Sequence, residues 1–266
     1  MLTYSNIKLG LTSLGLTDSL VIAHASMRVF GQIDGSAETL LSILLAAARG
    51  LIMPTFTYKT MLTPDVGPPG NGIAYGSNPD LNQMAEPFDV DMPADRLMGL
   101  LPETLRRHPA ARRTSHPILS FVGAGADSAL STQTLDDPFA PIGALAAQDG
   151  WVLLLGVDQT VNSAIHFAEK LAGRRQFVRW ALTSDRVVEC PGFPGDSFGF
   201  QVLAPDLEKD SRFVEIGQAV VQAIPLKRLF EVVTRRIKED PLALLCQRMD
   251  CERCSAIQAA YRGVSS

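Results

Sequence analysis

The sequence predicts a three-layer α/β/α sandwich with a mixed central sheet and an additional antiparallel β portion. Two observations lead to this fold class. Before Gly173, short apolar runs typical of buried strands alternate with segments whose apolar residues recur every three or four positions. After Gly173 the pattern changes, because the strand-like runs 176–182 and 186–190 flank Thr183-Ser184-Asp185, as in a β-hairpin.

The composition is that of an ordinary globular protein, with 46% hydrophobic and 20% charged residues among 266. We expect one domain, 1–266, ending in a cysteine-containing helical tail at about 241–266. The net charge of −4 argues against a nucleic-acid partner. The most apolar window, Leu40 to Met53, contains Arg49 and is too short to cross a bilayer. Since no signal-peptide pattern is found either, we expect a cytoplasmic protein without membrane association, as a monomer or homodimer.

The first elements follow from local patterns. Residues 19–26 predict a strand that carries His24 near its end, and a turn over Gly31–Gly35 follows. Ser36 can cap a helix that runs to about Arg49. Residues 51–57 predict a second strand, whose ladder stops at Pro54 because proline has no N–H to donate.

A long irregular segment, residues 58–95, comes next and is rich in turn-forming residues. Loops of this length inside compact domains are usually functional. The segment ends with four acidic residues, Glu86, Asp89, Asp91 and Asp95. Such a run is most often a solvated acidic loop. The alternative is an electronegative lip that concentrates a polyamine substrate.

Further elements lead to the middle of the chain. Residues 94–107 predict a helix, bent at Pro102. Residues 118–123 predict a strand, and a short helix near 142–148 follows it. In the C-terminal third the patterns are helical, notably over Lys227–Glu239.

The stretch from Trp151 to Gly173 joins a buried strand to an amphipathic helix. His166 and Glu169 are three residues apart and share one helix face, near Asn162. A histidine and a glutamate at this spacing are most often structural, with a hydrogen-bonded histidine on the helix and a glutamate on the surface. However, open α/β sheets bind ligands at the carboxyl ends of their strands. The functional interpretation is a general base with a carboxylate partner, either Glu169 or Asp158.

Two other groups of residues could form binding sites. Cys246, Cys251 and Cys254 form C-x4-C-x2-C, and Cys190 is the only other cysteine. Four thiolates make one tetrahedral zinc site, so we expect one structural zinc, although unrelated thiols are the alternative. Residues 112–116 place two arginines beside hydroxyl groups, which could grip phosphate, but surface arginine pairs are also common.

Five short segments occur in the order found in one known family. They are His24-Ala25-Ser26-Met27 (His-Ser-Ser-Leu in the family), Met53-Pro54-Thr55 (Met-Pro-Thr), Arg112-Arg113-Thr114-Ser115-His116-Pro117 (Arg-Arg-Ser-x-His-Pro), Leu154-Leu155-Gly156-Val157 (retained), and Ile165-His166-Phe167-Ala168-Glu169 (Leu-His-Leu-Ala-Glu). From about Ser19 to Pro205, the chain resembles the aminoglycoside 3-N-acetyltransferase family.

The resemblance implies transfer of acetyl from acetyl-CoA to the 3-amino group of a 2-deoxystreptamine aminoglycoside, on a fold distinct from that of the GNAT acetyltransferases. His166 would be the general base, with Glu169 or Asp158 as its partner, and His24 would be a second candidate. The implied cofactor-binding residues are Ser26, Met27, Arg28, Val29, Phe30, Thr55, Arg113 and Ser115. The implied acceptor-binding residues are Tyr58, Glu86, Asp89, Asp91, His116 and Asn162.

Some departures from the family pattern leave alternatives open. Ala25 stands where the family has a serine, and the segment 58–95 does not match the resistance enzymes closely. The acceptor could therefore be a different, non-antibiotic amine. A metal-dependent hydrolase is a second alternative, although His24, His116 and His166 include no close ligand pair. A non-catalytic binding protein that retains the fold is the third.

Overall fold

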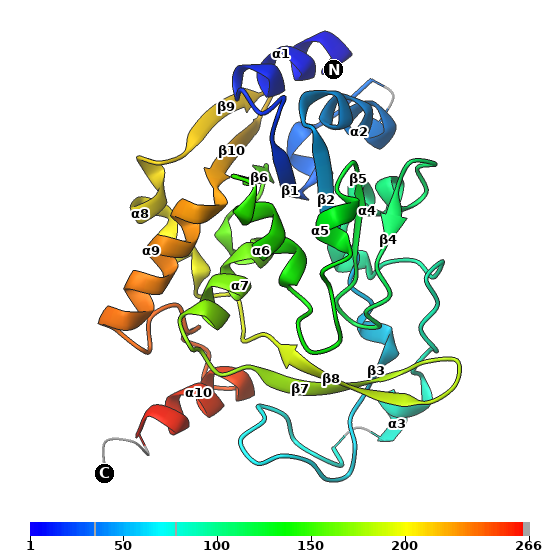
Figure 1. Cartoon of the computed structure of the whole chain (residues 1–266), viewed down its shortest axis with the longest axis vertical. Coiled ribbons are helices and arrows are strands. Elements are labelled where there is room, and N and C mark those ends of the chain that lie inside the picture. Colours follow the sequence, from blue (N-terminus) through cyan, green and yellow to red (C-terminus); the bar gives the residue numbers. More distant parts are fainter. Residues whose placement is uncertain (35, 78, 263–266) are drawn as a thin grey trace.

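The structure is a computed structural model that describes residues 1–34, 36–77 and 79–262 (Figure 1). Gly35 of the predicted turn and residues 263–266 of the predicted tail lie outside the described residues. Within the described part, no helix has the length and apolar character needed to cross a membrane.

The main sheet has seven strands in the order β4-β5-β2-β1-β6-β10-β9. Their bounds are β1 (Leu20–Ala25), β2 (Gly50–Pro54), β4 (Arg112–Arg113), β5 (Phe121–Ala124), β6 (Trp151–Leu155), β9 (Arg212–Ile216) and β10 (Ala219–Pro225). β1 pairs in parallel with both β2 and β6, and the remaining pairs are antiparallel. The mixed sheet is thus confirmed, and the carboxyl ends of its three parallel strands meet at one edge.

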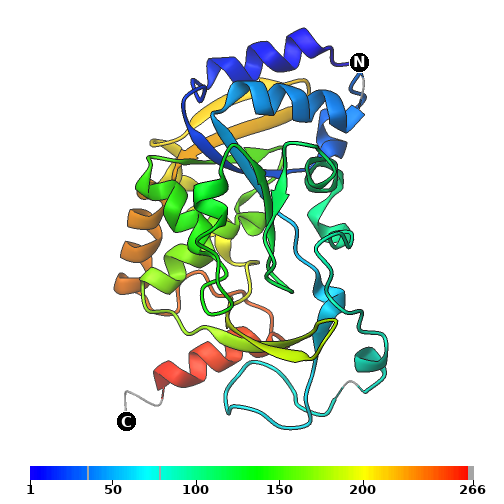
Figure 2. The ribbon, with the colours of Figure 1, turned by 45° about the vertical axis from the view of Figure 1, so that its right-hand side comes forward.

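Helices cover both faces of this sheet, which confirms the three layers. One apolar cluster packs α5 (Asp127–Leu130), α6 (Ala140–Ala147), α7 (Ser163–Leu171), α8 (Ala204–Glu208) and α9 (Leu226–Glu239) against one face. A second cluster packs α1 (Tyr4–Ser13), α2 (Ser36–Ala47) and α4 (Leu100–Arg106) against the other. Figure 1 shows α6, α7 and α9 side by side, and Figure 2 shows α1 and α2 together at one end of the molecule.

The predicted hairpin is confirmed as β7 (Phe177–Leu182) and β8 (Val187–Phe193), which form a separate three-stranded sheet with β3 (Met61–Leu62). The burial of β7 alternates along the strand, as expected when one face of a strand is covered. α3 (Pro79–Gln83) lies near β3 at the end of the molecule that also carries α10 (Glu252–Arg262) (Figure 1).

The predicted helix over 94–107 is interrupted at Gly99 and not at Pro102. A 3₁₀ turn, Arg96–Met98, precedes α4, and Gly99 joins them with a φ of 86°, which favours glycine. Pro102 is the third residue of α4. The first backbone N–H groups of a helix have no partner within it, so the missing N–H costs little there.

Two elements differ from expectation. The strand predicted at 118–123 begins only at Phe121, because Ile118 and Leu119 form a turn. The β9–β10 hairpin was not predicted at all. Gly217, with a φ of 64°, begins its two-residue connection. Alternating apolar residues on either side of this glycine are the signal that could have revealed it.

Candidate active site

Two histidines lie at the edge where the parallel strands end. His24 is the fifth residue of β1, and His166 is on α7. His24 shares a sheet face with Leu20 and Ile22, the face on which α7 packs. Its Nε2 accepts a hydrogen bond of 3.3 Å from the backbone N–H of Ser163, in the first turn of α7. The strand and the helix are therefore joined through this imidazole.

Burial keeps the His24 ring neutral. Loss of solvent, and secondly the nearby His166, lowers the pKa of His24 to about 3. Because Nε2 accepts from Ser163, the proton of the neutral ring belongs on Nδ1. His24 is thus a poor proton acceptor at neutral pH.

His166 is held in one orientation on three sides. Its Nδ1 lies 3.0 Å from Oε2 of Glu169. The rings of Phe200 and Phe139 lie against it, with centroids 4.8 Å and 5.8 Å away. The side chain retains 11% exposure, and within the described residues its Nε2 has no hydrogen-bond partner. The geometry leaves Nε2 as the atom that can meet a ligand.

The partner of Glu169 was missed by sequence reasoning. Nε of Arg174 lies 3.7 Å from Oε1 of Glu169, and both side chains are buried. Arg174 also donates to the carbonyl oxygen of Ala243 at 2.7 Å. The carboxylate therefore lies between an imidazole and a guanidinium. Asp158, by contrast, is exposed and accepts from the backbone N–H of Thr160, so the structure places Glu169 and not Asp158 against His166.

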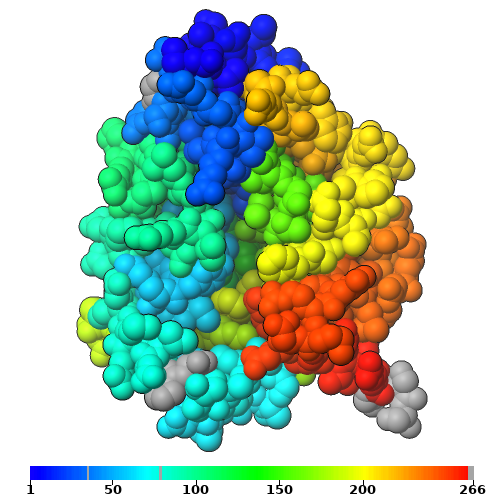
Figure 3. Space-filling view, turned by 180° about the vertical axis from the view of Figure 1, so that it is seen from behind, coloured from blue at the N-terminus to red at the C-terminus, as the bar shows by residue number. Residues whose placement is uncertain are grey.

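An open depression of about 580 Å³ lies beside the strand ends. Its lining includes Ser26, Val29 and Asp158, together with Gly156 and residues of β9 and β10. A Cβ on Gly156, whose φ is 66°, would lie 3.0 Å from Cβ of Val29, so glycine lets the two segments approach closely. Figure 3 shows a hollow on one side of the molecule, between the blue-to-teal part of the chain and the green-to-orange part.

The predicted cofactor residues divide between this surface and the interior. Ser26, Met27 and Val29 are partly exposed and Arg28 is exposed, around the 3₁₀ turn Met27–Phe30. Phe30 is buried in the second apolar cluster, and its contact with a cofactor stays a prediction. Apolar burial explains its position, because the ring packs beneath the turn.

Thr55 and Arg113 are also committed to internal contacts. Thr55 is fully buried, and its Oγ1 bonds to Ser120. Arg113 donates to the carbonyl oxygens of Thr55, Val90 and Met92. It thereby fastens the end of the long segment to β2, and burial lowers its pKa to about 10. Both residues were predicted to bind cofactor, and their polar groups are instead occupied by the protein itself. Ser115 is exposed.

The acidic residues predicted to bind the acceptor are exposed at the end of the long segment. Glu86 forms an ion pair of 2.5 Å with Lys59. Asp89 accepts from the backbone N–H of Asp91 at 2.7 Å, and both lie on the surface. Tyr58 is partly buried beside Phe56, and burial raises its pKa to about 12, so it remains a phenol donor. These side chains can form a lip.

Asn162 and His116 are structural. Asn162 is buried, accepts from the N–H of Ala164 and so caps α7, and its amide donates to Gln159. His116 is buried, and its Nδ1 accepts from the N–H groups of Ile118 and Leu119. The side-chain amide of Asn162 and Nδ1 of His116 thus close local turns, and the contacts of both residues with an acceptor stay predictions.

Because His24 and His116 are buried, we expect the folded protein to lose stability in acid. Burial lowers the pKa of His116 to about 4, as it lowers that of His24. At pH values between the pKa in the folded protein and the unfolded value of 6.5, the histidine is protonated in the unfolded chain but neutral in the folded one. The free energy of unfolding therefore falls as the pH falls below 6.5. At about pH 5, each histidine should cost about 2 kcal/mol of unfolding free energy.

Urea unfolding at about pH 7.5 and about pH 5 measures this loss. His116→Asn is the informative variant, because Oδ1 of asparagine can accept from the same N–H groups without titrating. We expect it to lose about 2 kcal/mol less than the parent protein between the two pH values. Equal losses in the parent and the variant would contradict this assignment.

A family profile described as aminoglycoside 3-N-acetyltransferase matches residues 22–238. The chain belongs to the aminoglycoside 3-N-acetyltransferase family. The match includes the histidines, the strand-end depression and the long segment.

Among relatives within this family, aminoglycoside N(3)-acetyltransferase VII of Streptomyces paromomycinus is 35% identical over 61% of this chain and 58% of its own length. Aminoglycoside N(3)-acetyltransferase IX of Micromonospora chalcea is 34% identical over 65% and 63%. Both matches span less than two thirds of the relative. Aminoglycoside N(3)-acetyltransferase III of Salmonella sp is 30% identical, and the match covers 76% of each chain.

Solved structures named as aminoglycoside acetyltransferases share the fold. A histidine-to-alanine variant of AAC(3)-IVa in complex with gentamicin has a TM-score of 0.78 and 23% identity, covering 97% of both chains. A binary complex of AAC-IIIb with CoASH has a TM-score of 0.68 and 20% identity, covering 89% of this chain and 96% of that one.

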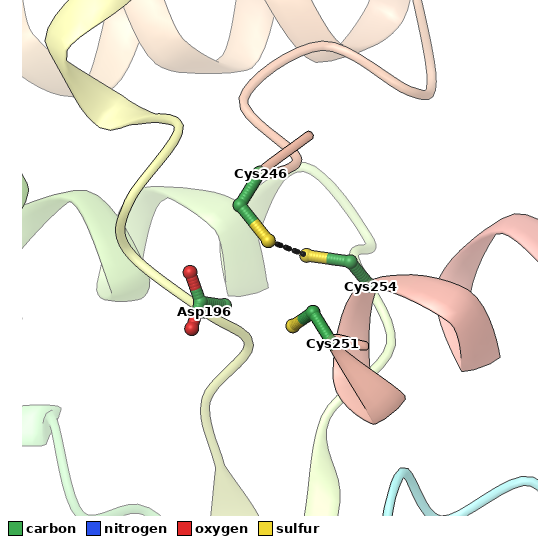
Figure 4. Close-up of side chains that lie close together, drawn as sticks. All are labelled: Asp196, Cys246, Cys251 and Cys254. Carbon is green, nitrogen blue, oxygen red and sulfur yellow. Dashed lines mark hydrogen bonds between the residues drawn. The ribbon is translucent and has the colours of Figure 1, made fainter. Parts of the chain in front are cut away.

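In this family member, three cysteines lie together but the fourth does not. Cys246, Cys251 and Cys254 gather with Asp196, and their ligand atoms all lie within 4.8 Å of one another (Figure 4). Cys190 belongs to the large apolar cluster instead, on β8, where burial raises its pKa to about 12. The prediction that Cys190 completes a zinc site is corrected, because its side chain packs into the core and Asp196 occupies the fourth place.

Proposed function

We propose that this protein transfers the acetyl group of acetyl-CoA to the 3-amino group of a 2-deoxystreptamine aminoglycoside, with His166 as the general base. The observation that carries the proposal is the orientation of His166. Its Nδ1 is held at 3.0 Å by Glu169, and its Nε2 has no hydrogen-bond partner within the described residues. This is the arrangement expected of a base whose tautomer is set by a carboxylate.

The chemistry follows from the substrate. A protonated ammonium has no lone pair, so it cannot attack a thioester. The amine therefore reacts in its neutral form, after releasing one proton to solvent. As the new N–C bond forms, Nε2 of His166 accepts a second proton from the nitrogen, and the thioester oxygen becomes an oxyanion. When that tetrahedral species collapses, the C–S bond breaks and its electron pair leaves with the sulfur of CoA. The proton held by His166 can then pass to the thiolate.

His24 fits a different role. Its Nε2 already accepts from Ser163, and burial lowers its pKa to about 3, so it cannot compete for a proton from an amine. By joining β1 to the first turn of α7, it positions the helix that carries His166. We therefore assign base catalysis to His166 and support of that helix to His24.

Two exposed surfaces suit the two substrates. Ser26 and Val29 line the depression at the strand ends, and Arg28 is exposed beside it, where a guanidinium could meet a CoA phosphate. Asp89 and Asp91 supply negative charge on the long segment. An aminoglycoside carries several positive charges, which a lip of this sign would attract.

Two observations favour aminoglycosides over other amines. The relatives are named as aminoglycoside N(3)-acetyltransferases, and a protein of the same fold is named as a complex with gentamicin. Against the hydrolase alternative, the only group of three or more metal-binding side chains within the described residues is the cysteine cluster, which contains none of the histidines.

The test is release of CoA thiol from acetyl-CoA in the presence of gentamicin, apramycin or an unrelated polyamine such as spermidine. We expect release with a deoxystreptamine aminoglycoside, with addition of one acetyl group at N3 seen by mass spectrometry and NMR. Release with spermidine but not with aminoglycosides would replace the acceptor and keep the reaction. Absence of amine-dependent release with the whole panel would contradict the proposed function.

A further inference from the structure

Three cysteines and one aspartate meet where α10 joins the body of the protein. Cys246 lies in the segment after α9, Cys251 directly precedes α10, and Cys254 is in its first turn. Asp196 lies on the segment that follows β8. All four residues are buried, and Figure 4 shows the sulfur atoms of Cys246 and Cys254 facing each other, with Cys251 and Asp196 beside them.

We propose that Asp196, Cys246, Cys251 and Cys254 bind one zinc ion. Zinc–sulfur bonds of about 2.3 Å arranged tetrahedrally place neighbouring ligand atoms about 3.8 Å apart. The sulfur atoms of Cys246 and Cys254 are 3.4 Å apart, and every pair in the group lies within 4.8 Å. Small side-chain movements therefore suffice for coordination. Three thiolates and one carboxylate are ligands that zinc accepts in tetrahedral sites.

The surroundings compensate the charge of such a site. Zinc with three thiolates and a carboxylate carries a net charge of −2. Arg253 lies 3.3 Å from Oδ2 of Asp196, and the charge of Arg248 interacts with Asp196 and Cys251. Oδ1 of Asp196 accepts from the backbone N–H of Phe198 at 2.9 Å, which fixes the carboxylate. Both oxygens keep a lone pair for a metal, and outer contacts of this kind orient metal ligands.

The metal would fasten the first turn of α10, ahead of the contact that Ile257 makes with the large apolar cluster. Within this helix, only Cys254 and Ile257 are buried. Ion binding would tie its first turn to the segment after β8, and hence to the three-stranded sheet. Folding and metal binding are coupled in small elements of this kind.

The same tether reaches the long segment that carries the acidic lip. Cα of Arg253 lies 2.8 Å from where a Cβ on Gly72 would be, so α10 and Gly72 are in close contact. Arg179 of β7 donates to the carbonyl oxygens of Asn71 and Gly72. In Figure 3 the orange-red part of the chain borders the hollow next to the cyan part. The zinc would therefore support the start of the long segment without touching the reacting atoms.

The first test is the metal content of the full chain, purified without chelator and measured by inductively coupled plasma mass spectrometry. We expect one zinc per chain in the parent protein and in Cys190→Ala, the matched control in which a buried cysteine outside the group is removed. Cys251→Ser and Asp196→Ala should bind zinc at least about 100-fold more weakly in competition with a chromogenic chelator.

Parent protein that holds no zinc after purification and after addition of zinc would overturn the proposal. So would a disulfide between Cys246 and Cys254 in the purified chain, or equal zinc affinity in Asp196→Ala and the parent. None of these measurements depends on acetyl transfer, so they stand apart from the test of the proposed function.

The rate of trypsin cleavage measures how firmly the zinc ion would hold α10. We expect zinc removal to speed cleavage after Arg248 by about tenfold, because cleavage follows the population of the locally open form. Cys190→Ala should retain the zinc-dependent protection, and Cys251→Ser should lack it. Cleavage at the same rate with and without zinc in the parent protein would contradict a role of the ion in holding α10.

Discussion

Replacing His166 with alanine is expected to lower turnover by a factor of about 100 or more, as for loss of a general base. Its Nε2 is the proton acceptor in the proposed mechanism, and no second imidazole can replace it, because Nε2 of His24 is occupied by Ser163 and its pKa is lowered to about 3. Affinity for acetyl-CoA should change little, since the predicted cofactor residues lie on the turn after β1. Thiol release under saturating substrates measures turnover.

His116→Asn is the matched control for this experiment. His116 is a buried histidine whose Nδ1 caps a turn, and it makes no bond to the candidate site. Its variant should keep near-normal turnover at neutral pH. Near-normal turnover in His166→Ala would move the catalytic role to His24 and contradict the assignment made here.

Replacing Glu169 with glutamine should affect both catalysis and stability. Turnover should fall less than in His166→Ala, and the pH optimum should move down, because the base loses the anion that stabilises its protonated form. The variant also leaves Arg174 buried beside a neutral amide, where the carboxylate had been 3.7 Å away. Breaking a buried ion pair costs about 3 kcal/mol or more of unfolding free energy. Urea unfolding and a pH–rate profile measure the two effects.

Two comparisons separate these effects. The double variant Glu169→Gln/Arg174→Met removes the unpaired guanidinium, so it should regain most of the stability but not the pH profile. Asp158→Asn alters the other carboxylate that sequence reasoning considered, and should leave both unchanged, because Asp158 is exposed and bonds to Thr160. An altered pH profile in Asp158→Asn with a normal profile in Glu169→Gln would exchange their roles.

Sequence patterns predicted the central part of the fold well. The strand Trp151–Leu155 has the predicted bounds, and α7 follows it and ends before Gly173. Helical periodicity also brought His166 and Glu169 to one face, because residues three apart on a helix are neighbours whatever surrounds them. Local geometry alone was sufficient for this pair.

Candidate residues outside that helix were harder to interpret. Thr55, Arg113 and Asn162 have side chains that suit ligand binding, yet each is bonded within the protein. Whether a hydroxyl, guanidinium or amide meets solvent depends on which distant segments cover it. Sequence spacing carries no information about that cover, since the three carbonyl groups that bind Arg113 lie more than twenty residues away.

The sequence by itself determined the alternation of strands and helices, the pairing of His166 with Glu169, and the close spacing of three cysteines. These depend on periodicity and short separations, which the backbone geometry of helices and strands sets directly. Only the tertiary structure decided that Arg174 accompanies Glu169, that His24 is buried and neutral, and that Asp196 replaces Cys190 in the cluster. Asp196 and Cys246 are brought together by the packing of separate elements, and such long-range contacts arise from the folding of the whole chain.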